Sequence, residues 1–401
     1  MRPVHYLGIF IPIAVGLELA HASPVLIFTA AALGVIPTAA VMGEATEHLA
    51  AQTGPAIGGF LNVTFGNAPE LIIAFFALKE GLQEVVKASI VGSIIGNILL
   101  VLGAAMLVGG LKREKQVFNQ TAAHAQASML LLALTALILP AVFQLVHGGG
   151  LPGVGEERVD FGADLEKLSL GVALVLMVTY AAGLVFTLKT HRKVFNPFEG
   201  AEAKKGEGDA KGDGEAKGKA ETEAKAKADG EGKTDGEGKA EADGEGHVHW
   251  SIKRSMISLG VAAVLVGLMS EVLVGSISEA SSEIGLSEFF VGVFVVAIVG
   301  NAAEHWVAVL VAAKDKMDLA VSIAVGSSAQ IALFVAPVLV LLSFVIGPNP
   351  MALVFKGYEL GCMLFAVLIS NFITQDGESN WFEGVQLLGV YAVLGLVFYF
   401  A

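Results

Sequence analysis

The sequence predicts an all-α polytopic membrane protein: eleven transmembrane helices, with an inverted 5+5 repeat preceded by one extra helix. Composition is the first reason, since 54% of the 401 residues are hydrophobic and only 16% are charged. Soluble domains carry about 25% charged residues. The second reason is a series of long apolar segments, and the third is a similarity between the two halves of the chain. The net charge of -13 comes largely from one linker and the loops, so it does not indicate an acidic soluble protein.

The apolar segments are measured against the roughly 20 residues that a helix needs to cross a bilayer. Eleven ranges qualify: 4–21, 24–50, 56–79, 86–110, 121–147, 164–190, 252–277, 287–312, 318–346, 350–373 and 381–400. The first follows a short basic start at Arg2 without a small-residue cleavage pattern, so we expect a retained helix and no signal peptide. The single cysteine, Cys362, lies in an apolar run and cannot form an internal disulfide.

The composition changes abruptly between the sixth and seventh segments. Residues 199–246 are nearly all Glu, Asp, Lys, Gly and Ala, with no large apolar side chain. Burial of apolar surface therefore cannot offset the entropy of ordering, and we expect a disordered linker. The chain accordingly divides into an extra helix (1–23), a first five-helix repeat (24–198), an acidic, lysine- and glycine-rich linker (199–249) and a second repeat (250–401).

The orientation in the membrane follows from the positions of Lys and Arg in short loops. Basic clusters occur at residues 112–115, 189–193, 253–254 and 314–316, and all follow even-numbered segments. We therefore expect the N-terminus and the linker in the cytoplasm. Lys79 and Lys87 weakly oppose this orientation.

An internal repeat relates the two halves. Gly66-Asn-Ala-Pro-Glu70 recurs as Gly300-Asn-Ala-Ala-Glu304, and Val91-Gly-Ser93 recurs at the same offset as Val325-Gly-Ser327. Glu70 lies on the third predicted helix and Glu304 on the eighth. An odd separation means that these helices run in opposite directions. Inverted repeats with polar, glycine-containing segments at matching positions are typical of alternating-access transporters with a site near the midplane.

The two glutamates need a counter-charge. A charged side chain at the bilayer centre costs about 2.5–3.5 kcal/mol on insertion scales, and no Lys or Arg lies in the central part of any predicted span. Protonation and cation binding remain, and they compete for the same carboxylate oxygens of Glu70 and Glu304. Such competition is the chemistry of an antiporter.

The candidate ligands are all oxygen atoms. We expect carboxylate ligands from Glu70 and Glu304, amide ligands from Asn67 and Asn301, and helix loosening at Gly66 and Gly300. Pro69 frees a backbone carbonyl one turn earlier. Calcium takes six to eight oxygen ligands in flexible geometry, and two carboxylates match its charge. Sodium would leave one excess negative charge unless one glutamate stayed protonated.

A second set of polar residues surrounds the pair. Ser93 and Ser327, with Asn97 and Gln330, are expected to support the site, whereas Glu47, Glu271 and His305 are candidates for gating or proton transfer. Several candidates also have a structural alternative. Asn67, Asn301 and His305 could serve only as hydrogen-bonding groups within the protein, the two serines as close-packing residues, and Glu47 as an interfacial charge. Gly92, Gly96 and Gly103 are expected to allow close helix packing.

The same residues resemble the calcium/proton exchanger (CAX-type) family of the cation/calcium exchanger superfamily. The segments from Phe65 to Leu71 and from Ala88 to Gly103 resemble its first α-repeat. Residues 300–305 with 324–330 resemble the second. Ala45-Thr-Glu47 and Ser270-Glu-Val-Leu-Val274 resemble the helices that precede each repeat. The resemblance implies eleven spans, an inverted core and calcium bound between the third and eighth helices. The family also has an acidic segment between spans six and seven, from which this lysine-containing linker departs.

The sequence thus predicts a secondary antiporter that exchanges Ca²⁺ for H⁺. We expect it to be an integral protein of a prokaryotic inner (plasma) membrane. Calcium is the transported substrate, protons are the counter-ion, and no cofactor or nucleic-acid partner is expected; a homo-oligomer in the bilayer is left open. Sodium or potassium in place of calcium, and a cation channel with a ring of glutamates, remain alternatives. An intramembrane enzyme is disfavoured, because no His-Glu-x-x-His motif, nucleophile elbow or phosphate loop is present.

Overall fold

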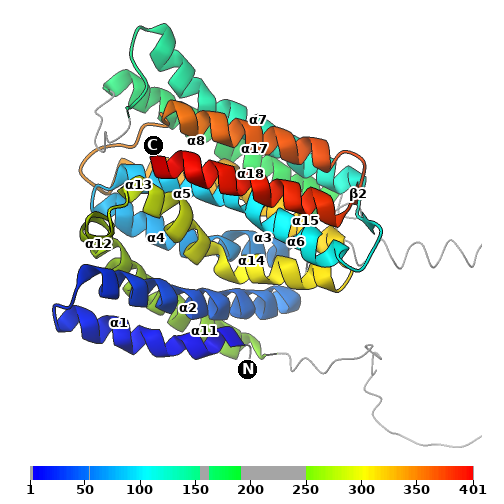
Figure 1. Ribbon diagram of the computed structural model, residues 1–401, viewed down its shortest axis with the longest axis horizontal. Helices are drawn as coiled ribbons and strands as arrows, with labels where there is room; N and C mark the ends of the chain where they lie inside the picture. The colour runs from blue at the N-terminus through cyan, green and yellow to red at the C-terminus, as the bar shows by residue number, and fades with distance from the viewer. Residues whose placement is uncertain (1–2, 54, 154–161, 191–249, 401) are drawn as a thin grey trace, which may run out of the picture.

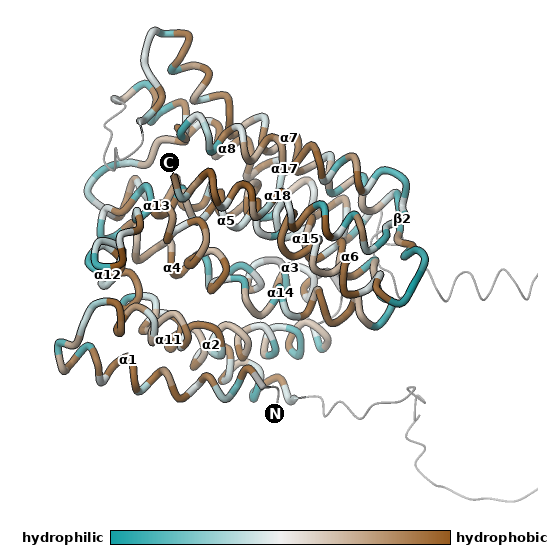
Figure 2. The backbone as a smooth tube through the Cα atoms, in the orientation of Figure 1, coloured by the Kyte–Doolittle hydropathy of each residue, from teal (hydrophilic) through white to brown (hydrophobic). Residues whose placement is uncertain are grey.

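The computed structural model describes residues 3–53, 55–153, 162–190 and 250–400, and it consists of long helices that lie side by side (Figure 1). The predicted linker, 199–249, lies outside the described residues, as do the basic residues 191–193. Along the described helices the backbone is mostly hydrophobic, and hydrophilic residues concentrate at the turns between them (Figure 2).

The half of the chain before the linker contains one short 3₁₀ helix, eight α-helices and one strand among the described residues. They are a 3₁₀ helix at Pro3–Ile9, α1 (Phe10–Leu19), α2 (Pro24–Thr53), α3 (Pro55–Gly66), α4 (Ala68–Lys79), α5 (Gln83–Ile95), α6 (Leu102–Gly110), β1 (Gln116–Val117), α7 (Gln120–Val146) and α8 (Ala163–Val185). A π-helical segment at Gly96–Val101 joins α5 to α6, and another at Phe186–Thr190 extends α8.

The half after the linker has a similar succession. Its elements are α11 (Ile252–Gly275), α12 (Ile277–Ile284), α13 (Glu288–Phe290), α14 (Ala297–Ala313), α15 (Met317–Gln330), α16 (Ala336–Ser343), α17 (Gly357–Ile373), β2 (Glu378–Ser379) and α18 (Trp381–Phe400). π-Helical segments at Val291–Val296 and Ile331–Val335 join α13 to α14 and α15 to α16. The segment at Ile331–Val335 lies at nearly the repeat-related position of Gly96–Val101.

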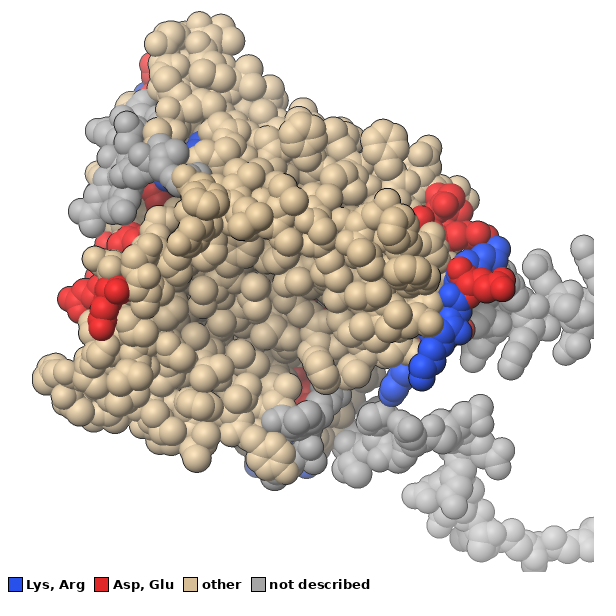
Figure 3. Space-filling model, viewed as in Figure 1, with Lys and Arg blue, Asp and Glu red and all other residues tan. Residues whose placement is uncertain are grey.

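The helices are long and apolar enough to define a polytopic membrane protein. Within the described residues, eight helical stretches meet the length and hydropathy expected of a membrane span, and α3 with α4 forms a ninth if this bent pair is one span. Two shorter apolar helices, Val4–Leu19 and Gly357–Ile373, accompany them. Figure 3 shows Lys, Arg, Asp and Glu gathered mainly at the two ends of one face, with a wide band between them almost without charge. The all-α membrane class is therefore confirmed, whereas eleven crossings stay a prediction.

Three helices, α1, α2 and α11, lie along one side of the bundle (Figure 1). α2 packs on α11 and α1 packs on α2, while α2 also contacts α14 and α11 contacts α4. In the rest of the bundle α14 packs on α6, α15 on α7, and α18 on α6. α2 and α11 therefore both contact the helices that carry the repeated Gly-Asn-Ala motif.

Two local predictions need correction. The predicted tenth span, 350–373, becomes helical only at Gly357, and Met351–Phe355 form a buried extended segment. Pro348 and Pro350 disfavour helix in the residues before them, and α17 begins where the Glu359 carboxylate accepts from the backbone N–H of Lys356. The fold is also not purely helical, because β1 and β2 form an antiparallel pair that joins the loops after α6 and after α17.

The glycine-rich α5–α6 stretch permits a close helix approach at particular positions. A Cβ atom built on Gly92 would overlap the carbonyl oxygen of Val293, and one on Gly103 would lie 2.9 Å from Leu387 Cβ. The close-packing prediction is confirmed for these two glycines. It is wrong for Gly96, where no heavy atom lies within 4 Å of a built Cβ.

We expect Gly92→Ala to destabilise the protein by about 1–3 kcal/mol, because the new methyl group has to push α5 away from Val293. Gly96→Ala in the same stretch is the matched control, and it should leave the apparent Tm unchanged or slightly higher. Thermal unfolding of both variants in the same detergent measures the difference. Equal melting temperatures for the two variants would contradict the close approach at Gly92.

Candidate cation site

The two repeated motifs adopt different backbone conformations. α3 ends at Gly66 and α4 begins at Ala68, with a bend of 44° between them. Pro69 occupies the first turn of α4, where its missing N–H does not interrupt a helical hydrogen bond. α14 continues through Gly300 without a break, because Ala303 stands where the first repeat has Pro69. Loosening of the helix at Gly300 was therefore predicted wrongly, and it occurs only in the first repeat.

Each glutamate lies against the glycine of the other motif. A Cβ atom built on Gly66 would lie 3.1 Å from Glu304 Oε1, and one built on Gly300 would lie 3.1 Å from Glu70 Cγ. The first residue of one motif, Gly66, thus meets the last residue of the other, Glu304, and Glu70 meets Gly300. The two segments therefore run antiparallel where they meet. The glycines thus leave the space that the opposite carboxylate occupies.

The two carboxylates have unequal surroundings. Glu70 is 5% exposed, and neither of its carboxylate oxygens takes part in a hydrogen bond. Glu304 is half-buried, and its Oε2 accepts a hydrogen bond from the Ser327 hydroxyl at 2.8 Å. Among the described residues, no Lys or Arg forms an ion pair with either glutamate. A buried carboxylate without a partner is costly, so this pair is suited to bind a proton or a cation.

Amide groups flank the carboxylates on both sides. Asn67 Nδ2 donates to Gln330 Oε1 at 2.7 Å. Asn301 Nδ2 donates to Ser93 Oγ at 3.0 Å and to the carbonyl of Ala297 at 2.9 Å. The Oδ1 atom of Asn301 is buried without a hydrogen bond. An oxygen in this position is suited to coordinate a hard cation.

His305 and Asn97 form a further contact next to Glu304. His305 Nε2 lies 3.0 Å from Asn97 Oδ1, so the ring nitrogen donates to the amide oxygen. The structure thus brings His305 and Asn97 together across two helices. The proton-transfer role of His305 stays a prediction.

A cavity of about 570 Å³ reaches the site from one side. Its lining includes Gly66, Glu304, Ser327, Gln330 and Glu47, but not Glu70. Glu304 therefore faces the cavity, whereas Glu70 lies behind it. The exposed side chain of Glu47 places a second carboxylate on the same path.

Glu271, the repeat-related partner of Glu47, lies elsewhere. His48 stacks on Trp250 near the start of α11, with ring centroids 4.8 Å apart, so the start of α11 is close to Glu47. Glu271 lies near the other end of this helix, about 30 Å along its axis at 1.5 Å per residue. There its Oε1 is 3.7 Å from Lys79 Nζ. The structure therefore brings Glu47, but not Glu271, to the cavity.

Sequence reasoning did not single out His5, which lines the cavity together with Glu44. His5 Nε2 lies 3.7 Å from Glu44 Oε2, and both residues line the cavity with Glu47. The sequence did contain a signal for His5, because it is an ionisable residue inside the first apolar segment, 4–21. Within the described part of the chain, no three His, Cys, Asp or Glu side chains cluster as a metal site.

Glu70 and Glu304, which form no ion pair with Lys or Arg among the described residues, give this membrane protein a candidate cation site. Residues 23–189 and 254–400 match the family described as sodium/calcium exchanger protein, so the chain belongs to this family. It is 43% identical to the Ca²⁺/H⁺ antiporter of Aphanothece halophytica, over 98% of this chain and 95% of that protein. It is 40% identical to the Ca²⁺/H⁺ antiporter ChaA of Bacillus subtilis, over 97% and 96% of the two chains.

Solved structures share the fold. The structure of native YfkE superposes with a TM-score of 0.74 at 36% identity, and the match covers 98% of both chains. The H⁺/Ca²⁺ exchanger CAX superposes with a TM-score of 0.64 at 13% identity, over 99% of this chain and 91% of that one. The second match extends the fold likeness to a distant sequence.

We expect Gly300→Ala to weaken cation binding about tenfold, because the added methyl group takes space beside Glu70 and displaces its carboxylate. A tenfold loss corresponds to about 1.4 kcal/mol. Calorimetric titration of the purified protein with Ca²⁺ measures the change. Gly260→Ala on α11 is the control, since no heavy atom lies within 4 Å of a built Cβ there. Wild-type affinity in Gly300→Ala would contradict the proposed contact between the two motifs.

Proposed function

We propose that this chain is a secondary antiporter that exchanges Ca²⁺ for H⁺ across a membrane. The observation that carries the proposal is the pair of Glu70, which is buried, and Glu304, which is half-buried at the cavity; neither has a basic partner among the described residues. Relatives named as Ca²⁺/H⁺ antiporters, matched over nearly their whole length, support the same ions. The chain is accordingly a transporter and not an enzyme.

The exchange follows from charge neutrality in a medium that solvates charge poorly. When Ca²⁺ leaves, the carboxylates of Glu70 and Glu304 gain protons; when Ca²⁺ returns, these protons leave. Neither state then carries an uncompensated buried charge. Because both ions use the same oxygens, the movement of one requires the opposite movement of the other.

The neighbouring residues have proposed roles in the same cycle. Asn67 and Asn301 supply amide oxygens to the cation, and Gly66 and Gly300 leave space for the carboxylates. Ser327 orients Glu304 through its hydrogen bond. Ser93 and Gln330 hold the two asparagine side chains by accepting their amide hydrogens.

Alternating access is supported by an asymmetry between the two halves. Glu304 lines the cavity and accepts from Ser327, whereas Glu70 does neither. In an inverted repeat, exchange of these two environments would open the site to the other side of the membrane. We propose eleven crossings, counted as the eight long stretches, the bent α3–α4 pair and the two shorter apolar helices.

The cavity is proposed to open toward the cytoplasm. Lys112, Lys115 and Lys314 follow α6 and α14, and cytoplasmic loops are enriched in Lys and Arg. Of the two lysines that oppose this orientation, Lys87 is buried within α5 beside Glu84 and does not lie in a loop. Similarity to bacterial antiporters supports a bacterial plasma membrane as the location.

We expect Glu70→Gln and Glu304→Gln each to abolish Ca²⁺ uptake driven by a pH gradient in proteoliposomes. Glutamine keeps the shape of the side chain but can neither balance the charge of Ca²⁺ nor release a proton. Uptake of ⁴⁵Ca²⁺ and the accompanying proton movement are measured together. Glu279→Gln, on an exposed position of α12, is the control and should transport at the wild-type rate. Full uptake in both site variants would rule out the carboxylate pair as the transport site.

A cysteine introduced into the cavity should be accessible only from the side of the linker. The background is Cys362→Ala, which removes the single native cysteine. Ser322→Cys lines the cavity, and Ser282→Cys, at an exposed position of α12, serves as the control at the opposite end. A membrane-impermeant thiol reagent should label the first from the linker side and the second from the other side. Labelling of both from one side would contradict the proposed direction of the cavity.

A further inference from the structure

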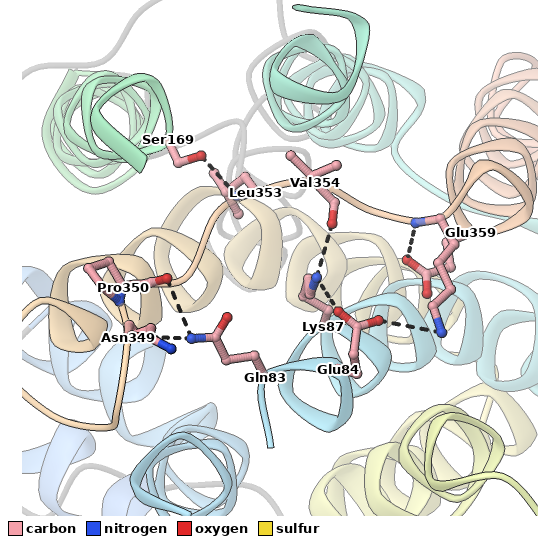
Figure 4. A network of polar contacts seen from close by, with 10 residues as sticks. Gln83, Glu84, Lys87, Ser169, Asn349, Pro350, Leu353, Val354 and Glu359 are labelled. Carbon is pink, nitrogen blue, oxygen red and sulfur yellow. Dashed lines mark hydrogen bonds and ion pairs between the residues drawn. The ribbon is translucent and has the colours of Figure 1, made fainter. Parts of the chain in front are cut away.

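A second buried group of charged side chains lies where α5 and α17 begin (Figure 4). Glu84 and Lys87 belong to the first turns of α5, and Lys356 and Glu359 belong to the start of α17. Their exposed fractions are 5%, 2%, 2% and 0%, in that order. Charged side chains this deeply buried are rare unless they compensate one another.

The four side chains do compensate one another. Lys87 Nζ contacts Glu84 Oε1, and Lys356 Nζ lies 3.5 Å from Glu84 Oε2. Glu359 Oε2 accepts a hydrogen bond from the backbone N–H of Lys356 at 2.9 Å. Two carboxylates and two ammonium groups make the cluster formally neutral. Lys356 Nζ also lies 5.1 Å from the centroid of the Phe289 ring.

The cluster is joined to the buried extended segment Met351–Phe355, which we call the strap. Backbone groups buried in this way need hydrogen-bond partners, and side chains of neighbouring elements supply several of them. Lys87 Nζ donates to the carbonyl of Val354 at 3.1 Å, and the backbone N–H of Leu353 donates to Ser169 Oγ at 2.9 Å (Figure 4). The N–H of Met351 donates to Ser343 Oγ at 2.7 Å.

The same helix that carries Glu84 and Lys87 also reaches the cation site. Ser93 on α5 accepts from Asn301, and Asn97 just beyond α5 accepts from His305. Lys87 and Ser93 are about 9 Å apart along the helix axis at 1.5 Å per residue. Gly92 is in such close contact with Val293 that α5 cannot move closer to the segment Val291–Val296. Because one continuous helical stretch carries both groups of residues, a displacement at the start of α5 would shift Ser93 and Asn97 as well.

We propose that Glu84, Lys87, Lys356 and Glu359 form an electroneutral anchor that fixes the start of α5 to the strap and to α17, and thereby positions Ser93 and Asn97 in the cation site. The four are positioning residues and do not contact the cation. The proposal rests on the proposed transport function for one of its two readouts. The balance of positive and negative charge within the cluster keeps α5 in place, and no single ion pair does so alone.

The test compares an unbalanced variant with a balanced one. Lys356→Met leaves one excess negative charge in the cluster, whereas Glu84→Gln together with Lys356→Met removes one charge of each sign. We expect Lys356→Met to raise the Ca²⁺ concentration for half-maximal uptake about tenfold, and to accelerate deuterium exchange of the strap amides. The double variant should return to within about threefold of the wild type, because replacing both partners of a buried pair is often near neutral. Lys115→Met, which breaks an exposed pair with Glu378, is the control and should change neither readout.

The outcomes separate the anchor from the transport function. Wild-type half-saturation and strap exchange in Lys356→Met, or a double variant as impaired as the single one, would overturn the anchor. Should Lys356→Met fail to fold, the double variant decides alone: near-wild-type behaviour supports the anchor, and failure to fold overturns it. Absence of Ca²⁺ uptake in the wild type would instead refute the proposed function, and deuterium exchange of the strap would still test the anchor.

Discussion

The energetic cost of a buried carboxylate is the constraint on which the rest of this structure depends. The middle of the bundle is lined mainly by apolar side chains and solvates charge poorly, so each ionised glutamate needs a counter-charge from the protein, from protons or from a cation. Glu70 and Glu304 receive none from the protein among the described residues. Their antiparallel placement, each against the glycine of the other motif, brings two such groups to one position. An exchange of cations for protons is the chemical consequence.

The two pairs of glutamates in the bundle differ in how their charge is balanced. Glu84 and Glu359 lie with Lys87 and Lys356, so this cluster is neutral without any ion from solution. Glu70 and Glu304 lack such partners and stay available for exchange. The first arrangement is suited to fix helices, and the second is suited to bind and release. α5 connects the two, since it begins at the neutral cluster and carries Ser93 into the site.

Much of this organisation could be predicted from local sequence, because hydropathy and motif repetition are local signals. The apolar ranges agree with most helix bounds to within a few residues, and the repeated motif predicted that Glu70 and Glu304 meet in antiparallel helices. Hydropathy could not reveal the strap, since its residues are as apolar as a span and only Pro348 and Pro350 signal an interruption. Nor could it pair Lys87 with Glu84 and Lys356, because that contact depends on two distant segments. Glu70 and Glu304 have unequal environments because the structure is in one conformation. Two nearly identical motifs do not predict which glutamate faces the cavity in that conformation.

The central claim is that Ca²⁺ and protons compete for one carboxylate pair. Initial rates of Ca²⁺ uptake in proteoliposomes, measured over a range of Ca²⁺ concentrations at several fixed pH values on the uptake side, test it most directly. Competition predicts that the Ca²⁺ concentration for half-maximal uptake rises as the pH falls, while the rate at saturating Ca²⁺ stays constant. A half-saturation concentration that does not change with pH would contradict the account.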